Sequence, residues 1–393
     1  MEVEAAPRFD PLAPEFLADP YPVYERLRAA GPVSRGGIAQ WVVSRYAEVA
    51  ALLRDPRLSH EFPDIYRQMS FGEGPANEFV RRVVLSREGS DHESLRRLLH
   101  RVMSATPQER LRARVPQLVE EILQAGLERG SLDLVGELAL PLPVAVICEL
   151  IGIPSSDREL VSQWAVDLGR VFTVILAPDD RPAADAAAVR LREYVGSLLD
   201  DPGRPAQLDE AAATAGAAHE EAVDNVIFLL LSGFTTTFHL LATTAAALLQ
   251  HPDQQARLRS DRSLVASAVE EFLRYDAPIQ HVTRLVTEPF QVGEQTLRRG
   301  RIVHLLLGSA NRDERQFPDP DRLDVGRHPN HHLSFGGGRH MCLGASLGRL
   351  ETAAAVGCLL DRCAVLEPAG PAVRRPMQVF RAHESVPARV RVA

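Results

Sequence analysis

Residues 226–250, VIFLLLSGFTTTFHLLATTAAALLQ, contain no Asp, Glu, Lys or Arg. A run of this length either crosses a bilayer or forms a helix that is buried on all sides within a protein. The middle of the run, SGFTTTFH, is polar at the depth where a membrane span should be most apolar. We therefore predict no membrane span, but a long buried helix inside a large, mostly helical protein, whose polar centre requires a function.

The composition is that of a soluble globular protein, with 45% hydrophobic and 24% charged residues over 393 positions. A formal net charge of -8 argues against nucleic acid as a partner. This length has to bury one large core or two packed lobes, and no linker-like segment interrupts the chain. We predict one domain over residues 1–393, mainly α in an α+β arrangement.

Periodicity and turn residues divide the chain into a helical part and a smaller β part. Helices are expected at 21–30, 45–56, 115–130 and 344–362, with Gly130 ending the third. The stretch 177–222, rich in Ala, Asp, Pro and Gly, predicts a helix flanked by mobile loops. Strands are expected at 38–44, within 281–313 and at 386–393, and a proline-rich meander occupies 315–329.

The four cysteines form no C-x-x-C pair and no regular framework, which suits a reducing compartment. The N-terminal sequence MEVEAAPRFDPLAPEF has neither a basic nor an apolar signal region. A cytoplasmic protein is expected.

One of these cysteines, Cys342, lies in the glycine-rich loop SFGGGRHMCLG at 334–344. A lone cysteine in such a loop is a candidate zinc ligand, nucleophile or haem ligand. His331, His332 and His340 lie nearby, but a structural zinc site usually has a second paired cluster, and the sequence has none. A nucleophile would need a histidine base that the fold supplies, which the sequence leaves open.

A haem thiolate explains more of the loop than either alternative. A sulfur that approaches a flat macrocycle closely needs neighbours without side chains, and the loop supplies them as glycines. Phe335 can pack beside the sulfur, and the helix expected after Cys342 directs its unpaired N–H groups at the sulfur, which favours thiolate. His340 can turn outward to a haem carboxylate.

Phe335, Gly338, Cys342 and Gly344 fit F-x-x-G-x-x-x-C-x-G, the cysteine-loop signature of the cytochrome P450 family. The longer stretch HLSFGGGRHMCLGASLGRLE resembles the soluble bacterial members almost throughout. The resemblance implies the P450 fold, with a large helical part and a small β part that enclose haem b (iron protoporphyrin IX). It also implies that Cys342 is the axial ligand of the haem iron.

The segment VEEFLRYDAP resembles the E-x-x-R motif of the family. Glu271 and Arg274 share a helix face at i and i+3, so they can form a buried ion pair. By resemblance, the third partner comes from the meander, and Arg322 is the expected match. The expected role is structural, bracing the cysteine loop.

The segment DHESLRR resembles the H-x-x-x-R by which bacterial P450s hold a haem propionate, with His92 and Arg96 on one helix face. Arg284 and His340 match the remaining propionate contacts. A dianionic cofactor in a mostly apolar pocket needs such neutralisation.

The segment LSGFTTTFH resembles the family's A/G-G-x-D/E-T-T. Ser232 takes the small-residue position, Gly233 the glycine and Thr236 the threonine on the oxygen side of the haem. Thr235 stands where the family usually has an acid, which puts the ordinary proton route in doubt. His239 is the nearest ionisable side chain, and core packing is its expected role.

The resemblance implies a monooxygenase that hydroxylates or epoxidises a mostly apolar small molecule, free or bound to a carrier protein, in specialised metabolism. Oxidative coupling or peroxide-driven oxidation on the same fold, and a non-catalytic haem-binding partner protein, remain as alternatives. A monomer that receives electrons from a ferredoxin and ferredoxin reductase is expected. Substrate contacts are expected from Phe228, Ser232, Ile279, Gln280 and Met377.

Overall fold

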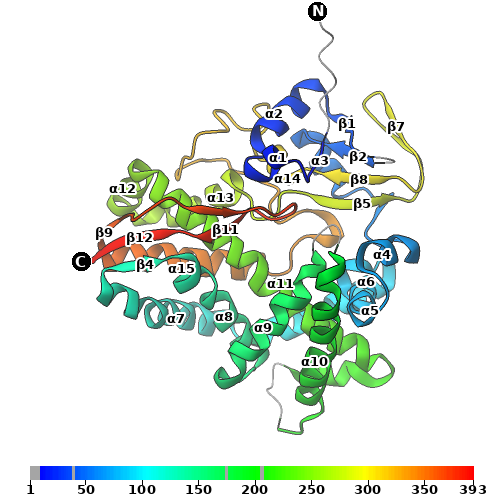
Figure 1. The fold of residues 1–393 in the computed structure, drawn as a ribbon, viewed down its shortest axis with the longest axis horizontal. Helices are drawn as coiled ribbons and strands as arrows, with labels where there is room; N and C mark the ends of the chain where they lie inside the picture. The colour runs from blue at the N-terminus through cyan, green and yellow to red at the C-terminus, as the bar shows by residue number, and fades with distance from the viewer. Residues whose placement is uncertain (1–8, 38–39, 173–175, 204–207) are drawn as a thin grey trace, which may run out of the picture.

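The computed structural model describes residues 9–37, 40–172, 176–203 and 208–393. Helices make up most of it, and in Figure 1 the largest sheet lies with the N-terminal helices on one side of the helical part. The first helices are α1 (Pro14–Ala18), α2 (Tyr21–Ala30), α3 (Tyr46–Leu52), α4 (Asp64–Phe71), α5 (Pro75–Arg82), α6 (Gly89–Ser104), α7 (Gln108–Arg129) and α8 (Pro141–Ile151). The later ones are α9 (Arg158–Gly169), α10 (Arg181–Asp200), α11 (Asp209–Gln250), α12 (Pro252–Ser260), α13 (Val265–Tyr275), α14 (Leu307–Ala310) and α15 (Ala345–Arg362).

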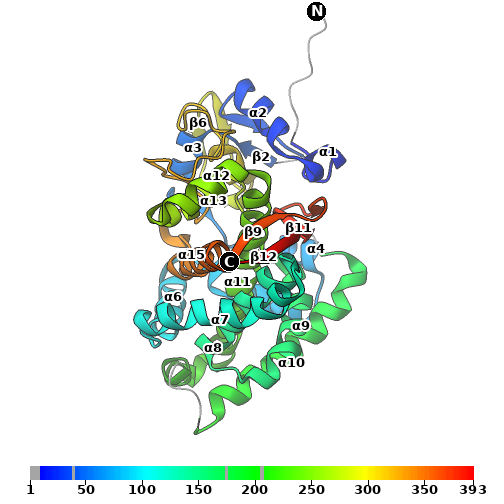
Figure 2. The ribbon, with the colours of Figure 1, turned by 90° about the vertical axis from the view of Figure 1, so that its left-hand side faces the viewer.

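The strands form four small sheets. They are β1 (Val33–Arg35), β2 (Gln40–Val43), β3 (Leu58–Ser59), β4 (Ser131–Asp133), β5 (Val282–Val286), β6 (Phe290–Val292), β7 (Gln295–Leu297), β8 (Ile302–Leu305), β9 (Cys363–Pro368), β10 (Val373–Arg375), β11 (Ala382–Ser385) and β12 (Pro387–Val392). The largest sheet has the order β1-β2-β8-β5-β3, in which only β2 and β8 run parallel. The others are β4-β12-β9, β10-β11 and β6-β7, and in Figure 2 β9 and β12 lie near α15 and α7.

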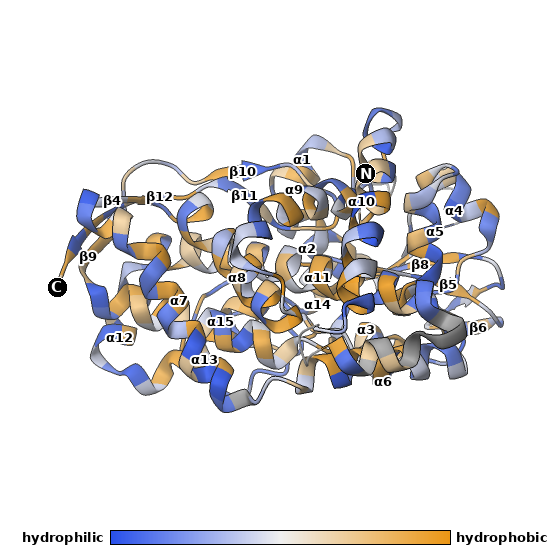
Figure 3. Ribbon diagram, turned by 90° about the horizontal axis from the view of Figure 1, so that it is seen from below, coloured by the Kyte–Doolittle hydropathy of each residue, from blue (hydrophilic) through white to orange (hydrophobic). Residues whose placement is uncertain are grey.

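The apolar run of the sequence lies in α11, which spans 42 residues and packs against α6, α8, α10 and α15. By length and composition α11 is the one helix among the described residues that could cross a bilayer. However, 67% of its most apolar 18-residue stretch is buried inside the protein. Figure 3 shows hydrophobic residues gathered on the helices at the centre of the molecule. The prediction of a long buried helix is therefore confirmed.

The helix begins earlier than the run indicates. We expected loops on both sides of the helix within 177–222, whereas α11 already starts at Asp209. Alanine has the highest helix propensity, so the alanine-rich segment after Asp209 extends the apolar helix by whole turns. The composition that indicated a loop is therefore also that of a good helix former.

Two of the glycines lie at helix ends. Gly130 ends α7 with a left-handed φ of 76°, as its position in the sequence predicted. Gly344 is the N-cap of α15, which starts directly after the loop that holds Cys342. The loop is thereby placed between α15 and the five-stranded sheet side of the molecule.

Candidate functional site

The middle of α11, the cysteine loop and two extended segments enclose a cavity of about 440 Å³. Thirteen of the residues expected from the sequence line it: Cys342, His92, Arg96, Arg284, His340, Phe335, Gly344, Gly233, Thr235, Thr236, Phe228, Ser232 and Ile279. These residues come from positions 92 to 344, so the fold brings together what the sequence separates. Their roles in binding or catalysis remain predictions.

The cysteine loop turns back on itself, and glycine is required for that path. The Cys342 N–H donates to the Phe335 carbonyl oxygen at 2.9 Å. Gly336 and Gly338 have left-handed φ values of 69° and 66°. A Cβ atom at Gly338 would lie 2.6 Å from the Leu53 carbonyl oxygen, so this glycine allows α3 and the loop to touch. Gly338 does not itself line the cavity.

Cys342 differs from the other cysteines in its surroundings. Cys148, Cys358 and Cys363 are buried, whereas Cys342 is exposed and lines the cavity. Although the side chain is exposed to the cavity, the surrounding protein shields the sulfur from bulk water and so raises the pKa of the thiol. The Gly344 N–H, Arg96 and Arg349 oppose that rise. The arrangement gives the cavity one accessible sulfur at the N-terminal end of α15.

Phe335 is held from three helices. It packs against Leu240 of α11 and against Val269 and Leu273 of α13. The Arg349 guanidinium of α15 lies 4.4 Å from its ring centroid and also pairs with Glu270 at 2.6 Å. The loop beside the sulfur is therefore fixed by packing on both of its flanks.

Basic side chains gather at one end of the cavity. The His340 ring lies 4.5 Å from that of His92 and 4.4 Å from that of His60. Arg284 is 5% exposed, and its guanidinium donates to the Thr283 carbonyl oxygen at 3.0 Å. Burial lowers the pKa of Arg284 to about 10 and that of His92 to about 4.

A single carboxylate, Glu88, faces this basic group. It accepts hydrogen bonds from the His60 N–H at 2.8 Å and from Arg339 at 3.0 Å, and its other contact is His340 at 3.2 Å. Together with Arg96 and Arg284, the group carries more positive than negative charge, and among the described residues no ion pair holds Arg284. A dianion fits such a site, as the two propionates of the predicted haem require.

His60 belongs to this group, and the sequence analysis missed it. It follows β3, far from the other histidines in sequence, and no spacing pattern connects it to them. Only the pairing of β3 with β5, the strand of Arg284, brings it to the cavity.

The polar centre of α11 faces the cavity without a carboxylate. The Thr236 hydroxyl donates to the Ser232 carbonyl oxygen at 2.9 Å, one helical turn back. Thr235 is half-buried and lines the cavity, and no Asp or Glu among the described residues does so. A Cβ atom at Gly233 would lie 2.7 Å from Ile147, so that glycine lets α8 pack against α11.

His239, the nearest histidine on α11, is buried outside the cavity lining. Its ring stacks on Phe380 at 4.9 Å between centroids. Burial, with Arg375 and His383, lowers its pKa to about 3, so the ring is neutral at physiological pH. This environment agrees with the packing role expected from the sequence.

The buried ion pair behind the loop has a different third partner from the expected one. Arg274 pairs with Glu271 at 2.8 Å, and both side chains are 0% exposed. The meander adds Arg327, whose Nε lies 3.1 Å from Glu271, and not Arg322. Arg322 has an exposed side chain and turns its carbonyl oxygen inward, where it accepts from Arg274 at 3.2 Å.

Two expected substrate contacts also lie elsewhere. Gln280 is 2% exposed, packs against Gly308 and donates to the Ala277 carbonyl oxygen, on the opposite side of the chain from Ile279. Met377 does not line the cavity either. The segment that contains it contributes Val379 and Phe380 to the cavity lining instead.

Comparison with known proteins identifies relatives along nearly the whole chain. A family model described as Cytochrome P450 matches residues 206–382. The chain is 34% identical to the biotin biosynthesis cytochrome P450 of Bacillus subtilis (strain 168) over 95% of its length and 96% of the relative. It is 35% identical to the cytochrome P450 monooxygenase PikC of Streptomyces venezuelae over 97% and 93% of the two chains.

Solved structures agree with this match. The structure of P450BioI in complex with a hexadec-9Z-enoic acid ligated acyl carrier protein superposes with a TM-score of 0.88 at 33% identity, covering 96% of this chain and all of that chain. CalO2 gives a TM-score of 0.92 at 32% identity and covers 98% and 99%. CxnD, a P450 for C–S bond formation in chuangxinmycin biosynthesis, gives 0.87 at 30% identity and covers 96% and 97%.

Proposed function

Because the chain belongs to the cytochrome P450 family, we propose that it is a cytoplasmic haem-thiolate monooxygenase that hydroxylates or epoxidises a mostly apolar small molecule in specialised metabolism. The observation that supports this most directly is the cavity itself. It combines an accessible cysteine sulfur, a basic cluster and a hydroxyl-lined helix within one enclosure.

The residues of the site fit haem b. Cys342 would bind the iron, Arg96 and Arg284 would neutralise the propionates, and His92 and His340 would hydrogen-bond to them. Bound haem would supply the oxidising chemistry, in which O2, two electrons and two protons give one oxygen atom to the substrate and one molecule of water. The protein contributes the thiolate, the apolar walls that exclude water and hydroxyl groups that pass protons.

The substrate class follows from the rest of the lining. The side chains away from the basic cluster are largely aliphatic or aromatic and come from several elements: Phe62, Val84, Leu85, Phe172, Phe228, Leu229, Ile279, Val282, Val379 and Phe380. Since no carboxylate lines the cavity among the described residues, a cationic substrate would find no partner there. An apolar body that presents one C–H or C=C bond to the iron fits best.

The test of this function is product analysis with isotopic oxygen. The haem-loaded protein, a ferredoxin, its reductase and NADPH are incubated under ¹⁸O2 with ligands chosen by spectral-shift screening. A product that gains one ¹⁸O atom supports the proposal. Products that are coupled without gaining oxygen, or turnover with peroxide alone, would support the alternative chemistries instead.

A second candidate substrate is an acyl chain attached to a carrier protein. The similarity to P450BioI, solved with an acyl carrier protein, favours it. Comparing free and carrier-bound forms of the same acyl group in the ¹⁸O2 assay separates the two forms of substrate.

Delivery of protons is expected to depend on Thr236. Thr236 lines the cavity, and its neighbour Thr235 supplies no charge. We expect Thr236→Ala to lower product formed per NADPH consumed by about tenfold, which is less than the roughly 10²–10⁴-fold contribution of an acid–base group to a rate, because uncoupled turnover also consumes NADPH. Thr235→Asp should keep or improve coupling with surrogate substrates, because it restores a carboxylate. Full coupling in Thr236→Ala would contradict this role.

Electrons are expected from a small acidic ferredoxin that docks near the cysteine loop. A groove of about 540 Å³ beside that loop is lined by His100, Arg112 and the Arg349–Glu270 ion pair, and Arg97 of α6 is also exposed. Arg101 of α6 and Arg110 of α7 are exposed as well, whereas Arg96 lines the cavity and Arg114 and Arg339 pair with carboxylates.

We expect the reduction rate to fall as salt rises, since exposed charges are screened beyond about 8–10 Å near physiological ionic strength. Reversing two exposed charges, in Arg97→Glu combined with Arg112→Glu, should raise the KM for ferredoxin about tenfold. The matched control is Arg190→Glu on α10, which should leave the KM unchanged. Salt-independent reduction would count against docking at this face.

A further inference from the structure

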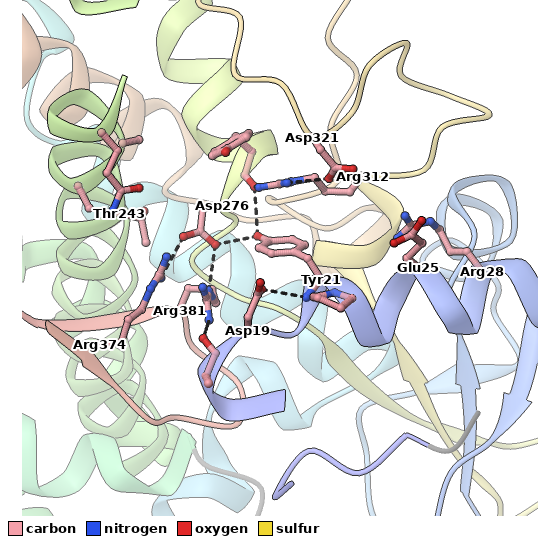
Figure 4. A pocket seen from close by; sticks show the side chains of 16 residues that line it. Asp19, Tyr21, Glu25, Arg28, Thr243, Asp276, Arg312, Asp321, Arg374 and Arg381 are labelled. Carbon is pink, nitrogen blue, oxygen red and sulfur yellow. Dashed lines mark hydrogen bonds and ion pairs between the residues drawn. The ribbon is translucent and has the colours of Figure 1, made fainter. Parts of the chain in front are cut away.

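A second, polar cavity of about 490 Å³ lies between α2, the end of α11, the end of α13 and the β10–β11 hairpin. None of its lining residues lines the proposed substrate cavity. Figure 4 shows Asp276, the residue that follows α13, at its centre, with the side chains of Tyr21, Arg374 and Arg381 directed toward it.

Asp276 is a buried carboxylate with three side-chain partners. It accepts from the Tyr21 hydroxyl at 2.7 Å, from Arg381 at 3.0 Å and from Arg374 at 3.1 Å, while it is only 7% exposed. Burial alone would raise its pKa, but Arg381, Arg374 and Tyr21 more than offset burial, so the pKa is lowered. The ionised carboxylate therefore joins α2, the end of α13 and the hairpin.

Arg312, which precedes the meander, makes further contacts with the side chain and backbone next to Asp276. The Arg312 guanidinium lies 4.0 Å from the Tyr21 ring centroid and 3.9 Å from that of Tyr275. It donates to the Tyr275 carbonyl oxygen at 2.7 Å and pairs with Asp321 at 2.8 Å. The Tyr21 hydroxyl also reaches the Tyr275 carbonyl oxygen, at 3.1 Å.

The segments joined at Asp276 continue into the wall of the substrate cavity. Pro278 and Ile279 follow Asp276, and Val379 and Phe380 precede Arg381, and all four line that cavity. The two segments are also hydrogen-bonded to each other. The Arg381 N–H donates to the Pro278 carbonyl oxygen at 3.0 Å, and Ile279 and Phe380 form an antiparallel β-bridge.

We propose that Asp276 is a positioning residue that determines substrate orientation, because it fixes the wall formed by Ile279 and Phe380 without touching the substrate. The inference rests on the proposed function, since it concerns the cavity in which the substrate binds. Loss of the carboxylate charge would free Arg374 and Arg381 and with them the hairpin, so the wall would shift relative to α11.

The test compares two azole probes in the haem-loaded protein, imidazole and 4-phenylimidazole, by their spectral shifts. Imidazole reports access to the iron, whereas the phenyl group extends into the cavity and reports its walls. Asp276→Asn keeps the size of the side chain and removes its charge. We expect it to raise the Kd of 4-phenylimidazole relative to imidazole by about fivefold or more, equivalent to about 1 kcal/mol.

Asp321→Asn is the matched control, because Asp321 pairs with Arg312 in the same cavity but has a side chain that is 73% exposed. It should change the ratio of Kd values by less than about twofold. Asp276→Glu should restore part of the wild-type ratio. If Asp276→Asn does not fold, Arg374→Gln replaces it, since its side chain is 33% exposed and the same direction is expected.

A purely structural role would lower Tm and leave the Kd ratio unchanged, and that result in both variants would overturn the inference. Failure of the proposed function looks different. A wild-type protein that shows neither a thiolate spectrum nor an azole shift would remove the haem-thiolate assignment, whereas a normal wild-type shift with an unaffected ratio contradicts only the role of Asp276.

Discussion

Replacing Cys342 by alanine is expected to abolish the red-shifted Soret band of the ferrous–CO protein. That band reports a thiolate on the haem iron, and Cys342 is the cysteine whose sulfur is accessible from the cavity. The measurement is a CO difference spectrum on haem-loaded protein, with haem content determined separately. We expect complete loss of the thiolate signal, even where the variant still binds haem.

Two other cysteines provide matched controls for that experiment. Cys358→Ala alters a buried thiol on α15 itself, and Cys148→Ala alters one on α8. Both variants should keep the full band, because neither sulfur reaches the cavity. A normal thiolate spectrum in Cys342→Ala would remove this residue from the ligand position and reopen the alternatives of a nucleophile or a zinc ligand.

Glu271→Gln is expected to have the largest effect on stability, with a loss of about 3–5 kcal/mol in the free energy of unfolding. The substitution leaves Arg274, which is 0% exposed, and Arg327 beside a neutral side chain. It also weakens the acceptors for the Asp324 N–H at 2.9 Å and for Asn330 at 3.1 Å, which hold the meander. The measurement is equilibrium urea unfolding at constant haem content.

The same experiment tests which arginine of the meander completes the ion pair. Arg327→Ala should destabilise the protein by about 2 kcal/mol or more, because it removes a charged hydrogen bond to a buried carboxylate. Arg322→Ala should cost less than about 0.5 kcal/mol, since its side chain is exposed and its carbonyl contact remains. Equal losses in the two variants would restore Arg322 as a partner.

The sequence by itself predicted those parts of the protein whose signals are local. Phe335, Gly338, Cys342 and Gly344 lie within one turn-and-helix unit, so their spacing carries the geometry of the loop directly. Glu271 and Arg274 are separated by one helical turn, and the charge-free run of α11 with its polar centre indicates a helix buried in a protein. In each case the physical constraint acts between residues that are close in the chain.

Only the tertiary structure decided the contacts between distant segments. His60 joins His92 and His340 because β3 pairs with β5. Arg327 pairs with Glu271 in place of Arg322, because the meander turns the Arg322 side chain outward. The cavity wall shows the same limit, since Phe380, which forms a bridge with Ile279, lines the cavity and Met377 does not. Such contacts depend on the conformations of the connecting loops, and loop conformations leave no periodic signal in a single sequence.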